Sequence, residues 1–294
     1  MKEYVLPVLR GISQIFFINN PWCGLIIVLA AAWAHPLLAV CMLLGSGVQT
    51  WLAQLLGWKE QAREGLMGYN GALVGAAAGF QLQSFPEALL FSLLGACACL
   101  PVHRFYEKLF LTPLLAPLKL PVLTAPFCTV AGLLTLLVAS LSHPGQVSSS
   151  SQILEGSLLG VFNGFSEVIL ADGLIAGVLI FIGLVIGSWK VALYGLFGNI
   201  LSLLCAGLLM GIENVSSGLY GYSALLAAAG LGAVFWNEKT KTKRWLGAGI
   251  ASLVTLPIYT ALVHTEIPVF TWPFVLALWI VMGLEYLLTV KNKG

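Results

Sequence analysis

Charged residues are scarce in this sequence. Only 9% of the 294 residues are charged, with 14 Lys and Arg against 12 Asp and Glu, whereas soluble domains carry about 25%. This shortage excludes a soluble fold. A net charge of +2 without clustered basic residues also excludes a nucleic-acid-binding surface. We therefore expect most of the chain to lie in membrane lipid and to have no nucleic-acid partner.

Patterns typical of enzymes and of secreted proteins are also missing. The six cysteines lie within or beside apolar runs and fit neither a disulfide framework nor a zinc site. No cluster of Asp, Glu, His or Cys has catalytic or metal-ligand spacing, so we expect no enzyme activity and no cofactor. The first residues, 1–4, show no signal-peptide pattern.

Long apolar runs are what the sequence does contain. Cutting the chain at charged, proline and turn residues leaves ten runs that could cross about 30 Å of hydrocarbon as helices. Two shorter stretches, residues 8–19 and 156–170, each hold one polar residue, Gln14 or Glu167, and predict re-entrant half-helices. The ten predicted spans are residues 20–35, 37–56, 66–83, 87–103, 121–142, 173–188, 190–211, 218–236, 245–263 and 268–290.

The positions of the basic residues support this count, because Lys and Arg are enriched in cytoplasmic loops. If the chain starts in the cytoplasm and both half-helices return to the side they came from, all 14 basic residues fall on the cytoplasmic side. The opposite side holds Glu87, Glu155, Glu213 and Glu266 without any Lys or Arg. We therefore predict a multi-pass membrane protein with both termini in the cytoplasm.

Three blocks of sequence recur in the same order. Residues 11–17 align with residues 164–170 at an offset of 153, which places Gln14 opposite Glu167. The other aligned blocks are residues 65–73 with 218–226, again at offset 153, and residues 121–127 with 268–274, at offset 147. The sequence therefore predicts two homologous halves.

Each predicted half contains five spans, an odd number, so the second half starts on the opposite side of the membrane from the first. Such halves are related by an axis in the membrane plane, with the substrate site near the midplane. We predict a first repeat at residues 1–142, an external linker at 143–152 and a second repeat at 153–294. The expected fold is an all-α integral membrane protein with two inverted repeats around a central pore.

Polar residues at membrane depth are the candidate functional groups. Glu167 is the clearest of these, but its repeat partner is the neutral Gln14. Because a neutral side chain fills the same position in the other half, we expect Glu167 to accept hydrogen bonds rather than to transfer protons or cations. Glu285 lies near the cytoplasmic end of the last span, where a polar contact at the interface is the alternative to any role in the pore.

Thr124 and Thr271 occupy the same position in a duplicated pattern, Pro-X-X-Thr-X-Pro-Phe. The second proline of each copy lacks an N–H and should leave a backbone carbonyl free to line a polar channel. A kinked helix with the threonine bonded to its own backbone is the alternative, and the duplication favours the pore. Phe17, Tyr69 and Tyr222 would add flat walls, with plain packing as their alternative. Together these groups suit a small, planar, neutral solute rich in N–H donors.

At these residues the chain resembles the urea transporter (urea channel) family. The resemblance rests on QIFFINNP from Gln14, GYNGALVG from Gly68 and both Pro-X-X-Thr-X-Pro-Phe copies, and it covers nearly the whole chain. It implies a bacterial member that forms a homotrimer in the inner cell membrane. Each protomer would contain one pore, surrounded by protein and membrane lipid, that conducts urea down its gradient.

The resemblance also implies roles for individual residues. It assigns Gln14 and Glu167 to two ladders of hydrogen-bond acceptors, and Thr124 and Thr271 to the centre of the selectivity filter. Two slots would flank this centre, one formed by Phe17 with Tyr69 and the other by Leu170 with Tyr222, and Leu73, Val168 and Leu226 would complete their apolar walls.

Two departures from the family pattern concern the second half. The first half-helix is followed by Asn20-Pro21, but the second is followed by Asp172-Gly173. Leu170 stands where the first half has Phe17. We therefore expect the outer slot to have a single aromatic wall.

Other functions stay open on the residues alone. The pore could pass another small neutral solute, such as a short amide, ammonia or water, or the protein could be an ion-coupled carrier that uses Glu167. Ammonia channels are disfavoured because the four histidines fall at span ends, and water channels because paired Asn-Pro-Ala loops are absent from the sequence. A purely structural membrane protein would leave the duplicated polar residues unexplained.

Overall fold

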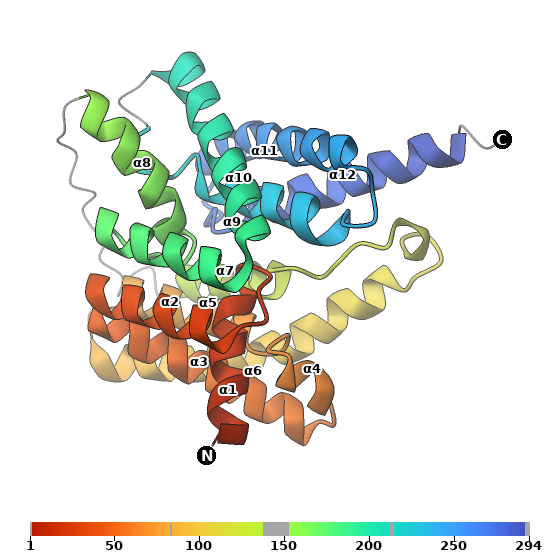
Figure 1. Ribbon diagram of the computed structural model, residues 1–294. Helices are drawn as coiled ribbons and strands as arrows, with labels where there is room; N and C mark the ends of the chain where they lie inside the picture. Colours follow the sequence, from red (N-terminus) through yellow and green to blue (C-terminus); the bar gives the residue numbers. More distant parts are fainter. Residues whose placement is uncertain (1, 83, 138–152, 212–214, 292–294) are drawn as a thin grey trace.

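The computed structural model describes residues 2–82, 84–137, 153–211 and 215–291, and these residues form helices joined by turns, with no strand among them. Helices of the first half of the chain, coloured red to yellow, group together on one side of the molecule (Figure 1). Helices of the second half, coloured green to blue, form the other group (Figure 1).

The two halves contain similar series of helices. The first half has α1 (Lys2–Gln14), α2 (Pro21–Ala34), α3 (Pro36–Leu55), α4 (Lys59–Arg63), α5 (Tyr69–Gln81), α6 (Phe85–Phe110), the 3-10 turn η1 (Ala116–Leu118) and α7 (Ala125–Leu137). The second half has α8 (Ile153–Glu167), α9 (Leu174–Met210), α10 (Tyr222–Ala229), the π-helix η3 (Gly230–Phe235), α11 (Lys241–Val263) and α12 (Trp272–Lys291).

Five helices in the described residues are long and apolar enough to cross a membrane, namely α3, α6, α9, α11 and α12. Three further apolar helices are shorter, at 10–17 residues: α2, α7, and α10 continued by η3. The described chain is therefore a helical, multi-pass membrane protein.

The predicted spans 173–188 and 190–211 correspond to two helical segments of α9 that meet at a kink. The helix bends at Ser188, whose φ of −163° and ψ of 101° are extended rather than helical.

The predicted half-helices at residues 8–19 and 156–170 correspond to α1 and α8. Both helices begin a few residues earlier than predicted, and each ends at its candidate polar residue, Gln14 or Glu167. The structure therefore places each of these side chains at a helix end, where the backbone changes direction.

The chain leaves both helices through the same kind of turn. Phe17 and Leu170 have left-handed φ values of 62° and 57°, which are uncommon for large side chains. In each turn the carbonyl of a serine, Ser13 or Ser166, accepts the N–H five residues later, at 3.2 and 3.0 Å. This bond satisfies a carbonyl at the helix end, as a low-dielectric surrounding requires.

The next helices, α2 and α9, start with different caps. The Asn20 side-chain oxygen accepts the N–H groups of Trp22 and Cys23 at 2.9 and 3.3 Å, and Pro21 occupies the first turn of α2. α9 follows Gly173, which has a φ of 107° and provides no side-chain cap. At the offset of 153, Gly173 and Leu174 therefore stand where the first half has Asn20 and Pro21, which changes how the helix starts but not that it starts there.

Helices α3 and α5 contact each other backbone to backbone. A Cβ atom at Gly71, Gly75 or Gly79 of α5 would lie 2.3, 2.1 or 2.8 Å from a backbone atom of α3. Small residues at a spacing of four allow this close approach in membrane helices, where packing replaces the hydrophobic effect as the driving force. The Gly-X-X-X-Gly spacing thus fixes α5, which carries Tyr69 at its start.

Helices α9 and α10 make the equivalent contact in the second half. A Cβ at Gly198 would lie 2.6 Å from the Ala224 carbonyl oxygen, and a Cβ at Gly45 would lie 2.0 Å from the Gly71 carbonyl oxygen. Gly45 lies 153 residues before Gly198, and Gly71 lies 153 residues before Ala224. The two contacts therefore use aligned positions of the two halves.

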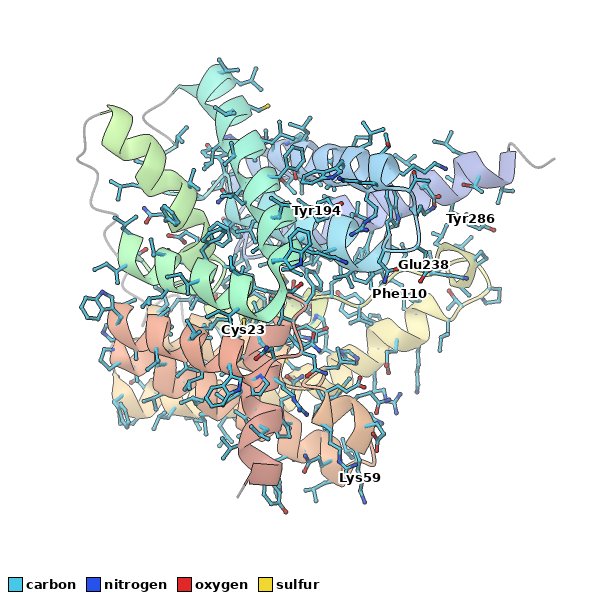
Figure 2. All side chains as sticks on the ribbon, in the orientation of Figure 1. Cys23, Lys59, Phe110, Tyr194, Glu238 and Tyr286 are labelled. Carbon is cyan, nitrogen blue, oxygen red and sulfur yellow. The ribbon has the colours of Figure 1, made fainter. Side chains whose placement is uncertain are left out.

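The two halves meet where α2 packs against α9. A Cβ at Gly187 of α9 would lie 3.0 Å from the Cβ of Cys23 and 2.7 Å from the Ile18 side chain. Figure 2 labels Cys23 near the start of α2, and Gly187 directly precedes the bend of α9 at Ser188. A glycine at this position thus lets a helix of one half approach a helix of the other.

We expect Gly75→Ala to destabilise the protein by about 1–3 kcal/mol, since α3 and α5 must separate to accommodate the added methyl group. Thermal unfolding of the detergent-solubilised protein measures the effect. Gly132→Ala in α7 is the matched control, because a Cβ there meets no atom within 4 Å. Equal melting temperatures for the two variants would contradict the close contact.

Candidate functional site

Two cavities lie on either side of a pair of threonines. The first has a volume of about 340 Å³ and the second about 150 Å³. Thr124 lines the first cavity and Thr271 the second, and their hydroxyl oxygens are 2.6 Å apart. The two residues are only 3% and 2% exposed. The Cys128 Sγ atom also lies 3.1 Å from the Thr271 hydroxyl, so two hydrogen bonds between side chains of the two halves lie where the cavities approach each other.

Most of the predicted site residues line these cavities. The first is lined by Gln14, Phe17, Tyr69 and Thr124, and the second by Glu167, Val168, Leu170, Tyr222 and Thr271. Leu73 and Leu226 line neither cavity and are fully buried in the core. They lie one turn beyond the tyrosines, where α5 and α10 pack against neighbouring helices.

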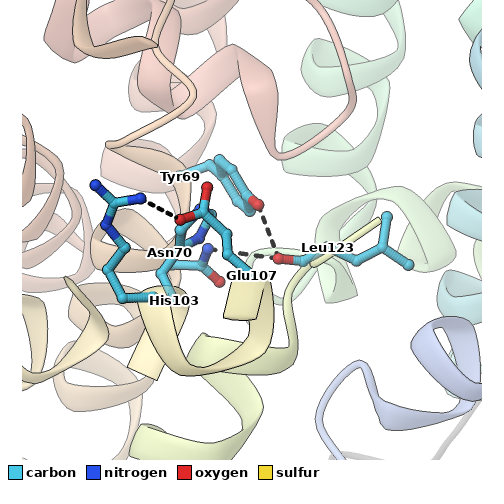
Figure 3. Close-up of polar contacts among 6 residues, drawn as sticks. Tyr69, Asn70, His103, Glu107 and Leu123 are labelled. Atoms are coloured by element: carbon cyan, nitrogen blue, oxygen red, sulfur yellow. Dashed lines mark hydrogen bonds and ion pairs between the residues drawn. The ribbon is translucent and has the colours of Figure 1, made fainter. Parts of the chain in front are cut away.

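Two tyrosines hold the loops that carry the threonines. Leu123 and Phe270, directly before the threonines, have left-handed φ values of 53° and 37°. The Tyr69 hydroxyl donates to the Leu123 carbonyl at 2.8 Å, and the Tyr222 hydroxyl donates to the Phe270 carbonyl (Figure 3 shows the first pair). The tyrosines therefore fix irregular backbone through their hydroxyls, a role that sequence analysis missed.

The carbonyls expected to be freed by the two prolines are hydrogen-bonded. The carbonyl four positions before Pro126 belongs to Val122, and the carbonyl four positions before Pro273 belongs to Val269. Each accepts the N–H three residues later, at 3.3 and 3.1 Å. The expectation of free carbonyls was wrong because a tight turn before each helix supplies a donor that the pattern of prolines does not reveal.

Asn70 reinforces the first loop. Its side-chain oxygen accepts the Phe127 N–H at 3.1 Å, and its amide nitrogen donates to the Leu123 carbonyl at 3.5 Å. The aligned residue in the second half is Ser223, whose buried hydroxyl has no hydrogen-bond partner among the described residues. The two loops therefore share a backbone shape but not the same set of supporting bonds.

Gln14 is oriented by a backbone contact. Its amide nitrogen donates to the Glu64 carbonyl at 2.9 Å, which leaves its amide oxygen as the group that can accept. Glu167 is half-buried and lines the second cavity. Glu285 lines neither cavity and forms an ion pair with Lys239.

Aromatic rings from both halves wall the first cavity. The Phe17 ring packs edge-to-face against Phe235 at 5.8 Å and against Phe274 at 5.9 Å between ring centroids. Phe235 lies in the π-helix η3, a rare backbone form that is often found at functional sites. Phe235 is not among the predicted site residues, because helical periodicity does not reveal a local change to hydrogen bonds between residues five apart.

The second cavity is more aromatic than the sequence suggested. Phe127, Tyr222, Tyr259 and Phe270 all line it, so the expectation of a single aromatic wall was wrong. The rings of Phe127 and Phe270 lie 5.1 Å apart. The Pro-X-X-Thr-X-Pro-Phe copy in the first half supplies Phe127 to the cavity of the second half, which comparison of aligned positions alone does not indicate.

Polar residues of α6 also line the first cavity. His103 and Glu107 lie one turn apart, with 3.5 Å between the imidazole Nε2 and a carboxylate oxygen. Arg104 binds the other carboxylate oxygen at 2.9 Å (Figure 3). The sequence places the histidines near span ends, and only the fold brings His103 to the cavity.

A helical membrane protein with two cavities that approach each other at a buried hydroxyl pair has the construction of a transport protein. Comparison with known proteins identifies the family: residues 5–286 match the family described as "Urea transporter", and the chain belongs to the urea transporter family.

Mammalian proteins are among its relatives. The chain is 28% identical over 317 residues to "Urea transporter 1" of Ovis aries, an alignment that covers 99% of this chain and 79% of that protein. It is also 28% identical over 311 residues to "Urea transporter 1" of Rattus norvegicus, an alignment that covers 98% of this chain and 77% of that protein.

We expect Tyr69→Phe to lower the free energy of unfolding by about 1 kcal/mol, because the Leu123 carbonyl loses its hydroxyl donor. Tyr4→Phe is the control, since Tyr4 is exposed near the start of α1. Thermal unfolding in detergent compares the two variants with the wild type. A Tyr69→Phe protein as stable as the control would show that the hydroxyl does not hold the loop.

Proposed function

We propose that the chain forms a passive, selective channel for urea that runs through both cavities and past the Thr124–Thr271 pair. The observation that carries this proposal is the 2.6 Å hydroxyl contact between the two cavities. A hydroxyl both donates and accepts, so a threonine pair can bond either to itself or to a solute between the two side chains. Urea, with four N–H donors and one carbonyl, matches that capacity.

Acceptors on both sides of the threonines support the same proposal. An unmade hydrogen bond costs roughly 2–7 kcal/mol when a polar group leaves water. The Gln14 amide oxygen and the Glu167 carboxyl line the two cavities, where they would accept from urea as its water is removed. Phe17 and Tyr222 provide flat walls beside them. Several weak positions in series permit fast release, as conduction requires.

We propose further that the chain consists of two inverted repeats, residues 1–142 and 153–294, joined by an external linker. Hydrogen bonds at aligned positions support this. The Ser46 hydroxyl donates to the Val8 carbonyl at 2.9 Å, and the Asn199 amide donates to the Val161 carbonyl at 2.7 Å. The two donors, Ser46 and Asn199, are 153 residues apart, and so are the two acceptors, Val8 and Val161.

The proposed topology has ten spans and two half-helices, with both termini in the cytoplasm. The location of all 14 basic residues on one side of this arrangement supports it. We also propose, from the family resemblance, a homotrimer in the inner cell membrane. Trp22, Leu29 and Trp33 of α2 are exposed apolar side chains that lipid or another protomer would cover.

We expect Thr124→Val and Thr271→Val to lower urea permeability roughly tenfold or more, because each leaves a polar group of urea unpaired between the cavities. Stopped-flow measurement of urea flux into proteoliposomes tests this, with Gly132→Ala as a control variant away from the cavities. Comparison with ammonia, water and short amides tests the alternative solutes. Wild-type vesicles that take up urea no faster than empty vesicles would refute the proposed function.

Glu167→Gln distinguishes a passive channel from an ion-coupled carrier. We expect it to keep at least half of the urea flux, since the amide oxygen accepts as Gln14 does, whereas Glu167→Leu should lose most of it. Flux should also be unchanged when proton and sodium gradients are collapsed. A requirement for either gradient, together with loss of flux in Glu167→Gln, would identify Glu167 as a coupling site.

A further inference from the structure

Helices α6 and α11 share a feature that lies outside the three repeated blocks. Each contains an interior proline, Pro101 or Pro257, followed two residues later by a ring that lines a cavity, His103 or Tyr259. Both pairs are separated by 156 residues. The two helices therefore present corresponding polar rings, one to each cavity.

His103 is buried with part of its hydrogen-bonding capacity unused. It is 6% exposed, and its Nδ1 atom has no partner among the described residues. The 3.5 Å separation from Glu107 is too long for a hydrogen bond of normal strength. This separation leaves the Nε2 atom and the Glu107 carboxylate able to bond to a solute in the cavity that both residues line.

Tyr259 is in a comparable position in the second cavity. It is 8% exposed, and its ring packs against Tyr220 with 4.9 Å between centroids. Its hydroxyl has no hydrogen-bond partner within the described part of the chain, whereas Tyr222 in the same cavity donates to the Phe270 carbonyl. Of these two hydroxyls, that of Tyr259 is therefore the one available to a solute.

We propose that His103, together with Glu107, and Tyr259 form two additional solute-binding positions, one in each cavity. The imidazole lone pair and the Glu107 carboxylate would accept N–H groups of urea, and the Tyr259 hydroxyl would accept from an N–H or donate to the carbonyl. Arg104, bound to Glu107 at 2.9 Å, holds the carboxylate in place. This inference rests on the proposed function and adds binding residues to it.

The concentration dependence of urea flux in proteoliposomes tests the proposal. We expect His103→Leu and Tyr259→Phe each to raise the half-saturating urea concentration roughly two- to tenfold, the effect of losing one hydrogen bond. His103→Gln, which keeps a side-chain acceptor, should restore a value near that of the wild type. Tyr220→Phe is the matched control for Tyr259→Phe, because Tyr220 lies against the same ring but lines neither cavity.

The possible results separate binding from structure. A lower maximal rate with an unchanged half-saturating concentration in both His103→Leu and Tyr259→Phe would assign the residues a structural role and overturn the inference. Unchanged flux in both variants, with normal wild-type flux, would overturn it as well. Urea uptake by wild-type vesicles no faster than by empty ones would refute the proposed function itself, and this inference with it.

Discussion

The site depends on hydrogen bonds that hold irregular backbone inside a membrane protein. Leu123 and Phe270 adopt left-handed conformations directly before the two threonines, and a tyrosine hydroxyl binds each of their carbonyls. Without water, a carbonyl outside a helix needs such a donor. The same bonds that make these loops tolerable in lipid also place the threonine hydroxyls 2.6 Å apart. Local stability and the position of the site therefore have one cause.

The aligned positions of the two halves provide a common frame, and the differences between them give the two cavities different character. The first cavity, of about 340 Å³, is walled by a phenylalanine from a π-helix and contains the His103 and Glu107 pair. The second, of about 150 Å³, has Tyr259 and several aromatic rings. Asn70 braces only one of the two loops. A solute would therefore meet unlike surroundings on the two sides of the threonines.

The duplicated polar residues are recognisable in the sequence because each half carries the same short pattern of residue types. Gln14, Glu167 and the threonines were identified in this way, and all four line the cavities. The carbonyls of Val122 and Val269 were wrongly expected to be free, because a turn donor depends on backbone conformation. Phe235 was missed because its position depends on a π-helix. Contacts between residues distant in sequence leave no periodic signal.

The sequence by itself determined that the chain lies in a membrane, that it is helical, and which residue types are duplicated. These properties follow from composition, from apolar runs and from the order of residues along one chain. Only the tertiary structure decided that Thr124 bonds to Thr271, that Phe127 lines the cavity of the other half, and that His103 reaches a cavity. These are relations between distant segments, and they depend on how closely the helices pack at glycines such as Gly75.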